Sequence, residues 1–199
     1  MLCRALARFA REDTVRPFGG LPSVGRPGRA ARVGTFTATP LAATDVLTDD
    51  ELAGIVDLFG ALRRPELSAA VSELAYRRGA EPPDVDAAVE TARSAFVLVA
   101  VPGQEGELLA VGPAAFPTLP DGAEDLPHIL DVEPRSVDRD RVGRAAEERL
   151  RGEAARAVAA GDADRIATLR DVTYDLEAWA PVALDTLRER LDAAADGTK

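Results

Sequence analysis

Apolar residues recur with helical spacing from the point where the chain first shows a regular pattern. After Thr48 the apolar positions return every three or four residues, at Leu52, Ile55, Val56, Phe59 and Leu62. This spacing predicts a helix with one apolar face. Thr48 can cap that helix, and the three acidic residues after it favour the positive end of the helix dipole.

Two further stretches predict two more helices. The second helix starts at residues 63–65, where proline fits the first turn, and it stops at Gly79 as the C′ residue. Its apolar positions are Leu67, Val71, Leu74 and Ala75. The third helix runs from Asp84 to about Ala95, and its apolar positions are Val85, Ala88, Val89 and Ala92.

A β-hairpin follows the third helix. Residues 96–101 form an apolar run of strand length, residues 102–106 have turn chemistry, and residues 108–111 supply a second short strand. Three helices and a hairpin in this order are typical of a winged helix-turn-helix, whose third helix reads DNA. Residues 47–112 are therefore expected to form a winged-helix-like domain.

The chain then passes through a proline-rich loop into a helical C-terminal region. Five prolines in residues 113–135 exclude a regular helix or a central strand. Apolar residues between them predict an ordered loop pinned to the core: Phe116, Leu119, Leu126, Ile129 and Leu130. Residues 136–195 are expected to pack on the first domain as a long helix to Ala160, a short helix after Asp162 and a last amphipathic helix. The expected fold class is mainly α.

The first 44 residues differ from the rest of the chain in charge and in amino-acid composition. Residues 1–44 carry seven arginines against two acidic residues, a net charge of +5, whereas residues 45–199 have a net charge of −15. Residues 17–40 are dense in Pro, Gly, Ser and Thr without any period, which is typical of disorder. We expect residues 1–46 to be a disordered basic arm or the product of a mis-assigned start, with Val46 at the true one. A targeting peptide and a nucleic-acid-binding tail are the alternatives.

The composition points to an acidic protein adapted to salt. The chain has 34 acidic and 24 basic residues, and only Lys199 is a lysine. In molar salt the Debye length is about 3 Å, so self-repulsion is screened while hydrated carboxylates keep the protein in solution. An ordinary acidic protein is the alternative. Cys3 is the only cysteine, which excludes an internal disulfide, and no apolar run approaches the ~20 residues of a membrane span. We expect a cytoplasmic protein without a cofactor.

Basic residues give a first set of candidate contacts, to nucleic acid. The predicted third helix and hairpin turn are acidic, and the only basic clusters lie at the two ends of the second helix. The candidates are Arg63, Arg64, Arg77, Arg78 and Arg93. An acidic recognition helix would repel phosphate, so nucleic-acid binding is not favoured. An arginine-rich face between Arg135 and Arg156 could bind an anion, although its interleaved acids favour a solvated helix face.

The proline-rich loop gives a second set, because it holds the only histidine beside three carboxylates. His128, Glu124, Asp125 and Asp131 could ligate a metal or perform acid–base chemistry. Only one imidazole is available, so a loop histidine bonded to a neighbouring carboxylate or backbone group is the alternative. The chain lacks the P-loop, GxGxxG, HExxH and GxSxG motifs, and we assign no catalytic residue.

Three segments resemble an uncharacterised haloarchaeal protein family. They are residues 47–53 (LTDDELA), 116–131 (FPTLPDGAEDLPHILD) and 174–181 (YDLEAWAP). The resemblance covers about residues 47–195 and excludes the arm. Such a family has no assigned activity, so it implies a salt-adapted cytoplasmic protein and carries over no functional residue.

Three functions remain open. The leading one is a non-enzymatic interaction or regulatory module with a protein partner or a second copy of itself. The first alternative is a winged-helix DNA-binding regulator, which predicts that arginines at the ends of the second helix share a face with the third. The second is an enzyme or metal site centred on residues 124–131, which predicts a pocket holding His128 with its carboxylates.

Overall fold

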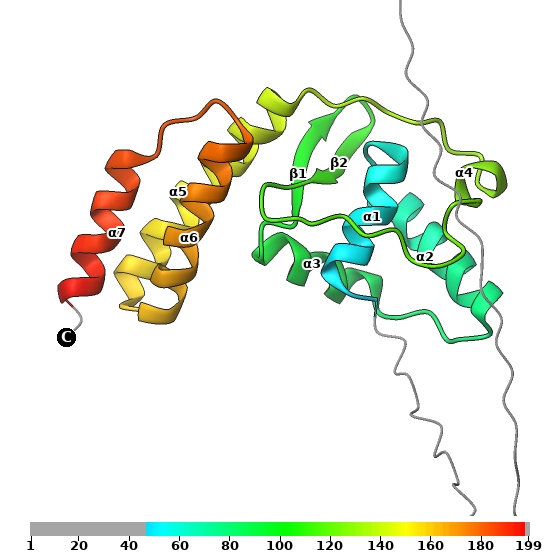
Figure 1. The fold of residues 1–199 in the computed structure, drawn as a ribbon, viewed down its shortest axis with the longest axis horizontal. Helices are drawn as coiled ribbons and strands as arrows, with labels where there is room; N and C mark the ends of the chain where they lie inside the picture. The colour runs from blue at the N-terminus through cyan, green and yellow to red at the C-terminus, as the bar shows by residue number, and fades with distance from the viewer. Residues whose placement is uncertain (1–46, 198–199) are drawn as a thin grey trace, which may run out of the picture. The chain divides into compact units, whose positions relative to one another are not determined.

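The computed structural model describes residues 47–197, which form seven helices and one β-hairpin (Figure 1). The helices are α1 (Asp49–Phe59), α2 (Arg64–Arg78), α3 (Val85–Ser94), α4 (Leu126–Ile129), α5 (Arg139–Ala160), α6 (Ala163–Trp179) and α7 (Asp185–Gly197). The antiparallel strands are β1 (Leu98–Gly103) and β2 (Gly106–Val111). The predicted order of three helices, a hairpin and a helical C-terminal region is confirmed. The expected arm, residues 1–46, lies outside the described residues.

Local capping sets the helix ends at the places that the sequence indicates. Thr48 and Glu51 form a capping box, in which each side chain accepts a hydrogen bond from the other residue's backbone N–H, at 3.2 and 2.9 Å. Gly79 ends α2 in the left-handed conformation, with φ of 67°. Gly60 ends α1 with φ of 73°, a value that glycine adopts readily.

The helices after Pro113 differ from the sequence prediction in three details. The loop contains the one-turn helix α4, because Pro127 occupies a first-turn position that needs no N–H donor. The long helix starts at Arg139 rather than at residue 136, since Asp138 caps it. The prediction of a short helix after Asp162 is wrong: α6 continues for 17 residues, because Val172 and Leu176 extend its buried stripe.

Both faces of the hairpin are covered by helices. The register pairs Leu98 with Val111 and Ala100 with Leu109, and these residues pack into a first core with α1, α2 and α3. The alternate pairs, Val99 with Ala110 and Val101 with Leu108, pack into a second core with α5, α6 and α7. Since side chains alternate between the two faces of a strand, neighbouring residues of one strand enter different cores. The hairpin therefore forms a wall shared by the two cores.

The first core also fixes the chain between α1 and α2. Leu62 is buried there and forms an antiparallel β-bridge with Leu109, through two backbone hydrogen bonds of 3.0 and 2.7 Å. This bridge places the start of α2 beside β2. The second core is built around three helices that contact one another, and α5 alone among them contacts β1 extensively.

The proline-rich loop is strapped across α1 by backbone contacts. The backbone N–H of Thr118 donates to the carbonyl of Asp50 at 3.0 Å, and the N–H of Arg135 donates to the carbonyl of Phe59 at 2.8 Å. Ala123 and Leu126 are fully buried in the first core. The loop's remaining large apolar residues divide: Leu130 is half-buried, whereas Phe116, Leu119 and Ile129 are exposed.

Gly54 makes the close approach of this strap to α1 possible. A Cβ atom at Gly54 would lie 2.2 Å from the carbonyl oxygen of Thr118, so the loop backbone would have to move. We expect Gly54→Ala to lower the free energy of unfolding by about 1–3 kcal/mol through this clash. Gly→Ala in a helix otherwise stabilises by roughly 0.5–1 kcal/mol.

The matched control is Gly152→Ala in α5. There the nearest atom to a new Cβ is the flexible end of Arg156 at 3.5 Å, so this substitution should stabilise the protein. Urea denaturation of both variants measures the sign of the change in unfolding free energy for each. Equal stabilisation by both would show that the loop does not press on α1.

Candidate functional site

The first group of candidate residues lies where α2 begins beside α3. Arg64 donates to the carboxylate of Asp86 at 3.1 Å and to that of Glu90 at 2.7 Å. The hydrogen bond from Arg64 lowers the pKa of Glu90, and the same contacts raise the pKa of Arg64. Arg64 is thus held by two acidic side chains of α3.

Arg93 continues this charge network from α3 to the hairpin. Its guanidinium lies 3.2 Å from the carboxylate of Glu90 and 3.7 Å from that of Glu107 on β2. Its Nε atom is buried and has no hydrogen-bond partner within residues 47–197. Asp86 and Glu90 of α3 and Glu107 of β2 are thus each paired with an arginine.

A second network joins the start of α2 to the segment before α5. Two guanidinium nitrogens of Arg135 donate to the two carboxylate oxygens of Glu66 at 2.7 and 2.6 Å, a bidentate pair. Glu66 also accepts from the backbone and side chain of Arg63, at 2.7 and 3.2 Å. Arg63 extends further to Glu105 in the hairpin turn. The pair is largely buried, with 17% of the Glu66 side chain and 23% of the Arg135 side chain exposed.

The arginines at the other end of α2 contact the proline-rich loop instead of α3. Arg77 donates to the carbonyl of Gly122 at 3.1 Å and to the carboxylate of Asp125 at 3.3 Å. Arg78 donates to the carbonyl of Asp121 at 2.7 Å. These bonds hold the turn at residues 121–125 against α2. Of the two basic clusters, only the one that contains Arg64 meets α3.

The histidine of the loop is exposed on α4 and does not gather the neighbouring carboxylates. Its backbone N–H donates to the carbonyl of Asp125 at 2.9 Å, while the Asp125 carboxylate faces Arg77. Within residues 47–197 no group of three His, Cys, Asp or Glu side chains could hold a metal ion. The interpretation of His128, Glu124, Asp125 and Asp131 as a metal or acid–base site stays a prediction, and these contacts do not support it.

Sequence reasoning missed the residues that hold the arginines. Glu66 and Glu105 are the partners of Arg63, and Arg135 comes from 69 positions away to reach Glu66. The spacing of Arg63 and Glu66, three residues apart across the start of a helix, is the one local signal that could have indicated a cap there.

The comparisons with known proteins give a family and no activity. The model of a family of unknown function, DUF7109, matches residues 50–196. The chain belongs to this family. No curated protein and no solved structure matches the chain. Among the described residues of this DUF7109 member, no helix has the length and apolar character needed to cross a membrane.

The Glu66–Arg135 pair predicts a specific acid sensitivity. Burial raises the pKa of Glu66, but the hydrogen bonds from Arg135 and from the Arg63 backbone outweigh it, and the net pKa lies below the ordinary 4.5. A lowered folded-state pKa contributes stability above the ordinary pKa, and that contribution is lost as the pH falls through the folded value. We expect Glu66→Gln to cost about 2 kcal/mol of unfolding free energy at neutral pH.

Urea denaturation at about pH 7 and about pH 3 measures the effect. The gap between wild type and Glu66→Gln should narrow at the lower pH, because acid removes the same charge from the wild type. Glu133→Gln, at an exposed position of the loop, is the control and should change little at either pH. A gap that is the same at both pH values would contradict the role of the Glu66 charge.

Proposed function

We propose that this protein is a non-enzymatic interaction module that binds a protein partner. The observation that carries the proposal is the distribution of exposed large apolar side chains. Of the six among the described residues, four belong to the end of α2 and to the loop at residues 116–129, and we call these four the apolar surface: Tyr76, Phe116, Leu119 and Ile129. Aromatic residues are enriched at protein interfaces.

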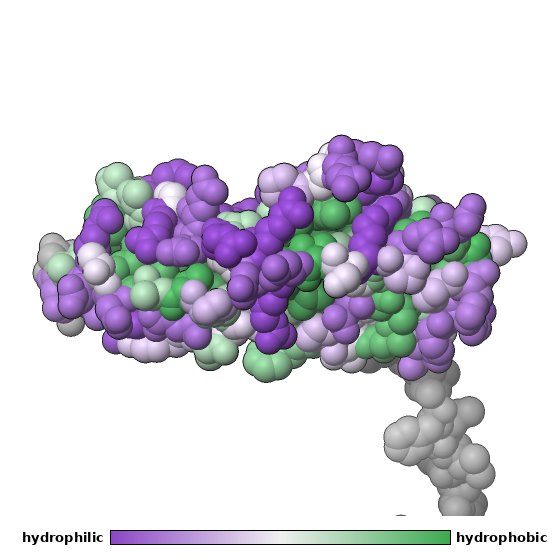
Figure 2. Space-filling view, turned by 90° about the horizontal axis from the view of Figure 1, so that it is seen from above, coloured by the Kyte–Doolittle hydropathy of each residue, from purple (hydrophilic) through white to green (hydrophobic). Residues whose placement is uncertain are grey.

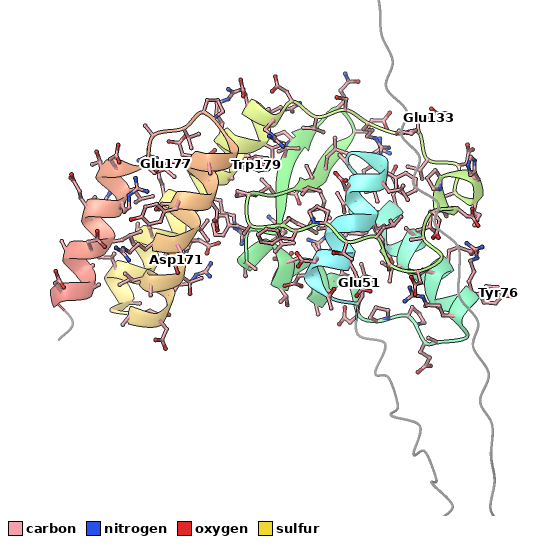
Figure 3. All side chains as sticks on the ribbon, in the orientation of Figure 1. Glu51, Tyr76, Glu133, Asp171, Glu177 and Trp179 are labelled. Atoms are coloured by element: carbon pink, nitrogen blue, oxygen red, sulfur yellow. The ribbon has the colours of Figure 1, made fainter. Side chains whose placement is uncertain are left out.

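The exposure of the two aromatic residues is unusually high. Tyr76 is 81% exposed and Phe116 is 78% exposed. Tyr76 extends away from the end of α2 (Figure 3). Figure 2 shows one face of the molecule, on which apolar residues are exposed between hydrophilic ones. Burying an aromatic side chain of this size contributes about 1.5–3 kcal/mol. A partner that covers both rings would therefore gain a substantial part of its affinity from them.

The segments that carry the apolar surface are held in place, which favours a preformed interface. Arg77 and Arg78 bind the turn at residues 121–125, and α4 contacts α2. The backbone N–H of Phe116 donates to the carboxylate of Asp50 at 3.0 Å. A partner would then meet fixed side chains and lose less conformational entropy on binding. Exposed carboxylates at Asp121 and Glu124 favour a partner with a basic rim.

A double variant, Tyr76→Ser with Phe116→Ser, tests the proposal. Affinity purification from the source cells, followed by titration of the protein recovered, should give at least a tenfold weaker Kd for the variant. The control, Val158→Ser with Tyr174→Ser, removes exposed apolar residues of α5 and α6 and should bind as the wild type does. Equal loss in both variants, or none in the first, would contradict the proposal. Light scattering on the purified chain decides whether the partner is a second copy.

The alternative is a winged-helix DNA-binding regulator. The order of elements in residues 47–112 favours it, and so does the contact of Arg64 with α3. The outward side chains Asp86 and Glu90 weigh against it, since phosphate would have to displace them from Arg64. Failure of the protein to shift genomic DNA fragments at any salt concentration it tolerates would remove this alternative.

We also propose that the protein works in a salt-adapted cytoplasm. The net charge of −15 on residues 45–199 supports the proposal, because this charge destabilises a folded chain at low salt. Asp171 and Asp175 are a local example of this repulsion, since they are exposed like charges four residues apart on α6.

We expect the Tm to rise by several degrees between about 0.1 M and about 3 M KCl, as the Debye length shrinks from about 10 Å to about 2 Å. A triple variant, Asp171→Asn, Asp175→Asn and Glu189→Gln, should have a higher Tm than the wild type at low salt and a smaller rise with KCl. Differential scanning calorimetry measures both. A Tm that is flat or falls with KCl would contradict salt adaptation.

A further inference from the structure

A hollow of about 480 Å³ lies beside the hairpin turn and is lined by three segments that are far apart in the sequence. Arg63 lines it at the start of α2 and Glu105 at the hairpin turn, while Arg135 lies in the segment before α5 and Arg141 in the first turn of α5. Its volume falls in the range of about 300–1,000 Å³ that is usual for small-molecule sites.

The hollow has a positive surplus in a strongly acidic chain. Three guanidinium groups face it, from Arg63, Arg135 and Arg141, against the carboxylates of Glu105 and of Glu66 behind it. Residues 45–199 as a whole have a net charge of −15. Three arginines from separate segments concentrate positive potential at one point, and a concave surface strengthens such a field.

The two carboxylates differ in how firmly they are held. Glu66 is mostly buried and is bound bidentately by Arg135, so it belongs to the framework. The side chain of Glu105 is 74% exposed on the turn, and its ion pair within the described residues is with Arg63 alone. An exposed ion pair contributes only about 0–1 kcal/mol. An incoming oxyanion can therefore replace Glu105 at little cost.

Arg141 keeps its charge available. Its guanidinium donates to the backbone carbonyl of Pro102, and it makes no ion pair within residues 47–197. The side chain is exposed at the first turn of α5. A guanidinium offers five donors in a planar fork, so one bond to a carbonyl leaves donors for an oxyanion. Ser136, which also lines the hollow, can add a hydroxyl donor.

We propose that this hollow binds a small multivalent oxyanion, a molecule carrying phosphate or several carboxylate groups. Arg63 and Arg141 bind the anion, Arg135 is held in position by Glu66, and Glu105 occupies the place at Arg63 that the anion takes. Because Arg63 adjoins α2 and Arg141 lies on α5, the bound anion joins the two helical groups on either side of the hairpin. The site is independent of the apolar surface.

Isothermal titration with pyrophosphate and with citrate, each at constant ionic strength set with KCl, tests the proposal on the full chain. We expect saturable binding of at least one anion and at least a tenfold weaker Kd in Arg141→Gln and in Arg63→Gln. Glu105→Gln should bind several-fold more tightly, because the competing carboxylate is gone. Preference for pyrophosphate indicates a phosphate ligand, and preference for citrate indicates a polycarboxylate.

The control is Arg144→Gln, which removes an exposed arginine of α5 outside the hollow and should leave the Kd unchanged. Arg141 and Glu105 are both exposed, so their variants keep the test valid if Arg63→Gln does not fold. Absence of saturable binding to both anions, equal weakening by Arg144→Gln, or no tightening by Glu105→Gln would each overturn the proposal.

Discussion

Burial of the hairpin on both faces is the constraint on which the rest of the fold depends. A two-stranded sheet of six-residue strands is not stable alone and needs apolar cover. Here α1–α3 cover Leu98 and Leu109, while α5–α7 cover Val99 and Ala110. Neither helical group can leave without exposing one face of the sheet. The body of the hairpin is thus enclosed by helices, and its turn at residues 103–106 is the part that lies outside both cores, where Glu105 is exposed.

Local patterns predicted most of the elements but not how they are covered. The spacing after Thr48 and the glycine at position 79 predicted α1 and the end of α2, because capping and amphipathic periodicity are local properties. The apolar run at residues 96–101 predicted a strand, and its lack of polar alternation is the signature of a strand buried on both faces. Most of the cover depends on contacts between elements far apart in the chain, such as α1 with β2 and α5 with β1. The length of α6 was missed for a different reason: the local repeat of Ile166 and Leu169 continues at Val172 and Leu176, and it was followed only part of the way.

The arginines of the candidate site could be predicted from the sequence, whereas the carboxylates that pair with them could not. Arg63, Arg64 and Arg93 stand out in a chain that has almost no lysine, yet their chemistry is set by carboxylates that the fold brings to them. Glu90 lies 26 positions from Arg64, and Glu66 lies 69 positions from Arg135. These separations leave no periodic signal in the sequence. An arginine cluster can therefore be located by reading the chain, whereas its availability to a ligand requires the structure.

The function that an arginine cluster can serve depends more on whether its side chains are available to a ligand than on how many arginines it contains. On the α3 side Arg64 has two carboxylate partners, Asp86 and Glu90, and Glu90 is shared with Arg93 at 3.2 Å. A DNA phosphate would have to displace more than one carboxylate there, and it would be repelled by the displaced charges that remain on α3. At the hairpin turn Arg141 has a neutral acceptor and Arg63 has the exposed Glu105, so a small oxyanion displaces one weak pair. In a molecule with so many carboxylates, positive charge can act on a ligand only where the fold leaves an arginine incompletely neutralised. The hairpin turn is such a place, and the outward face of α3 is not.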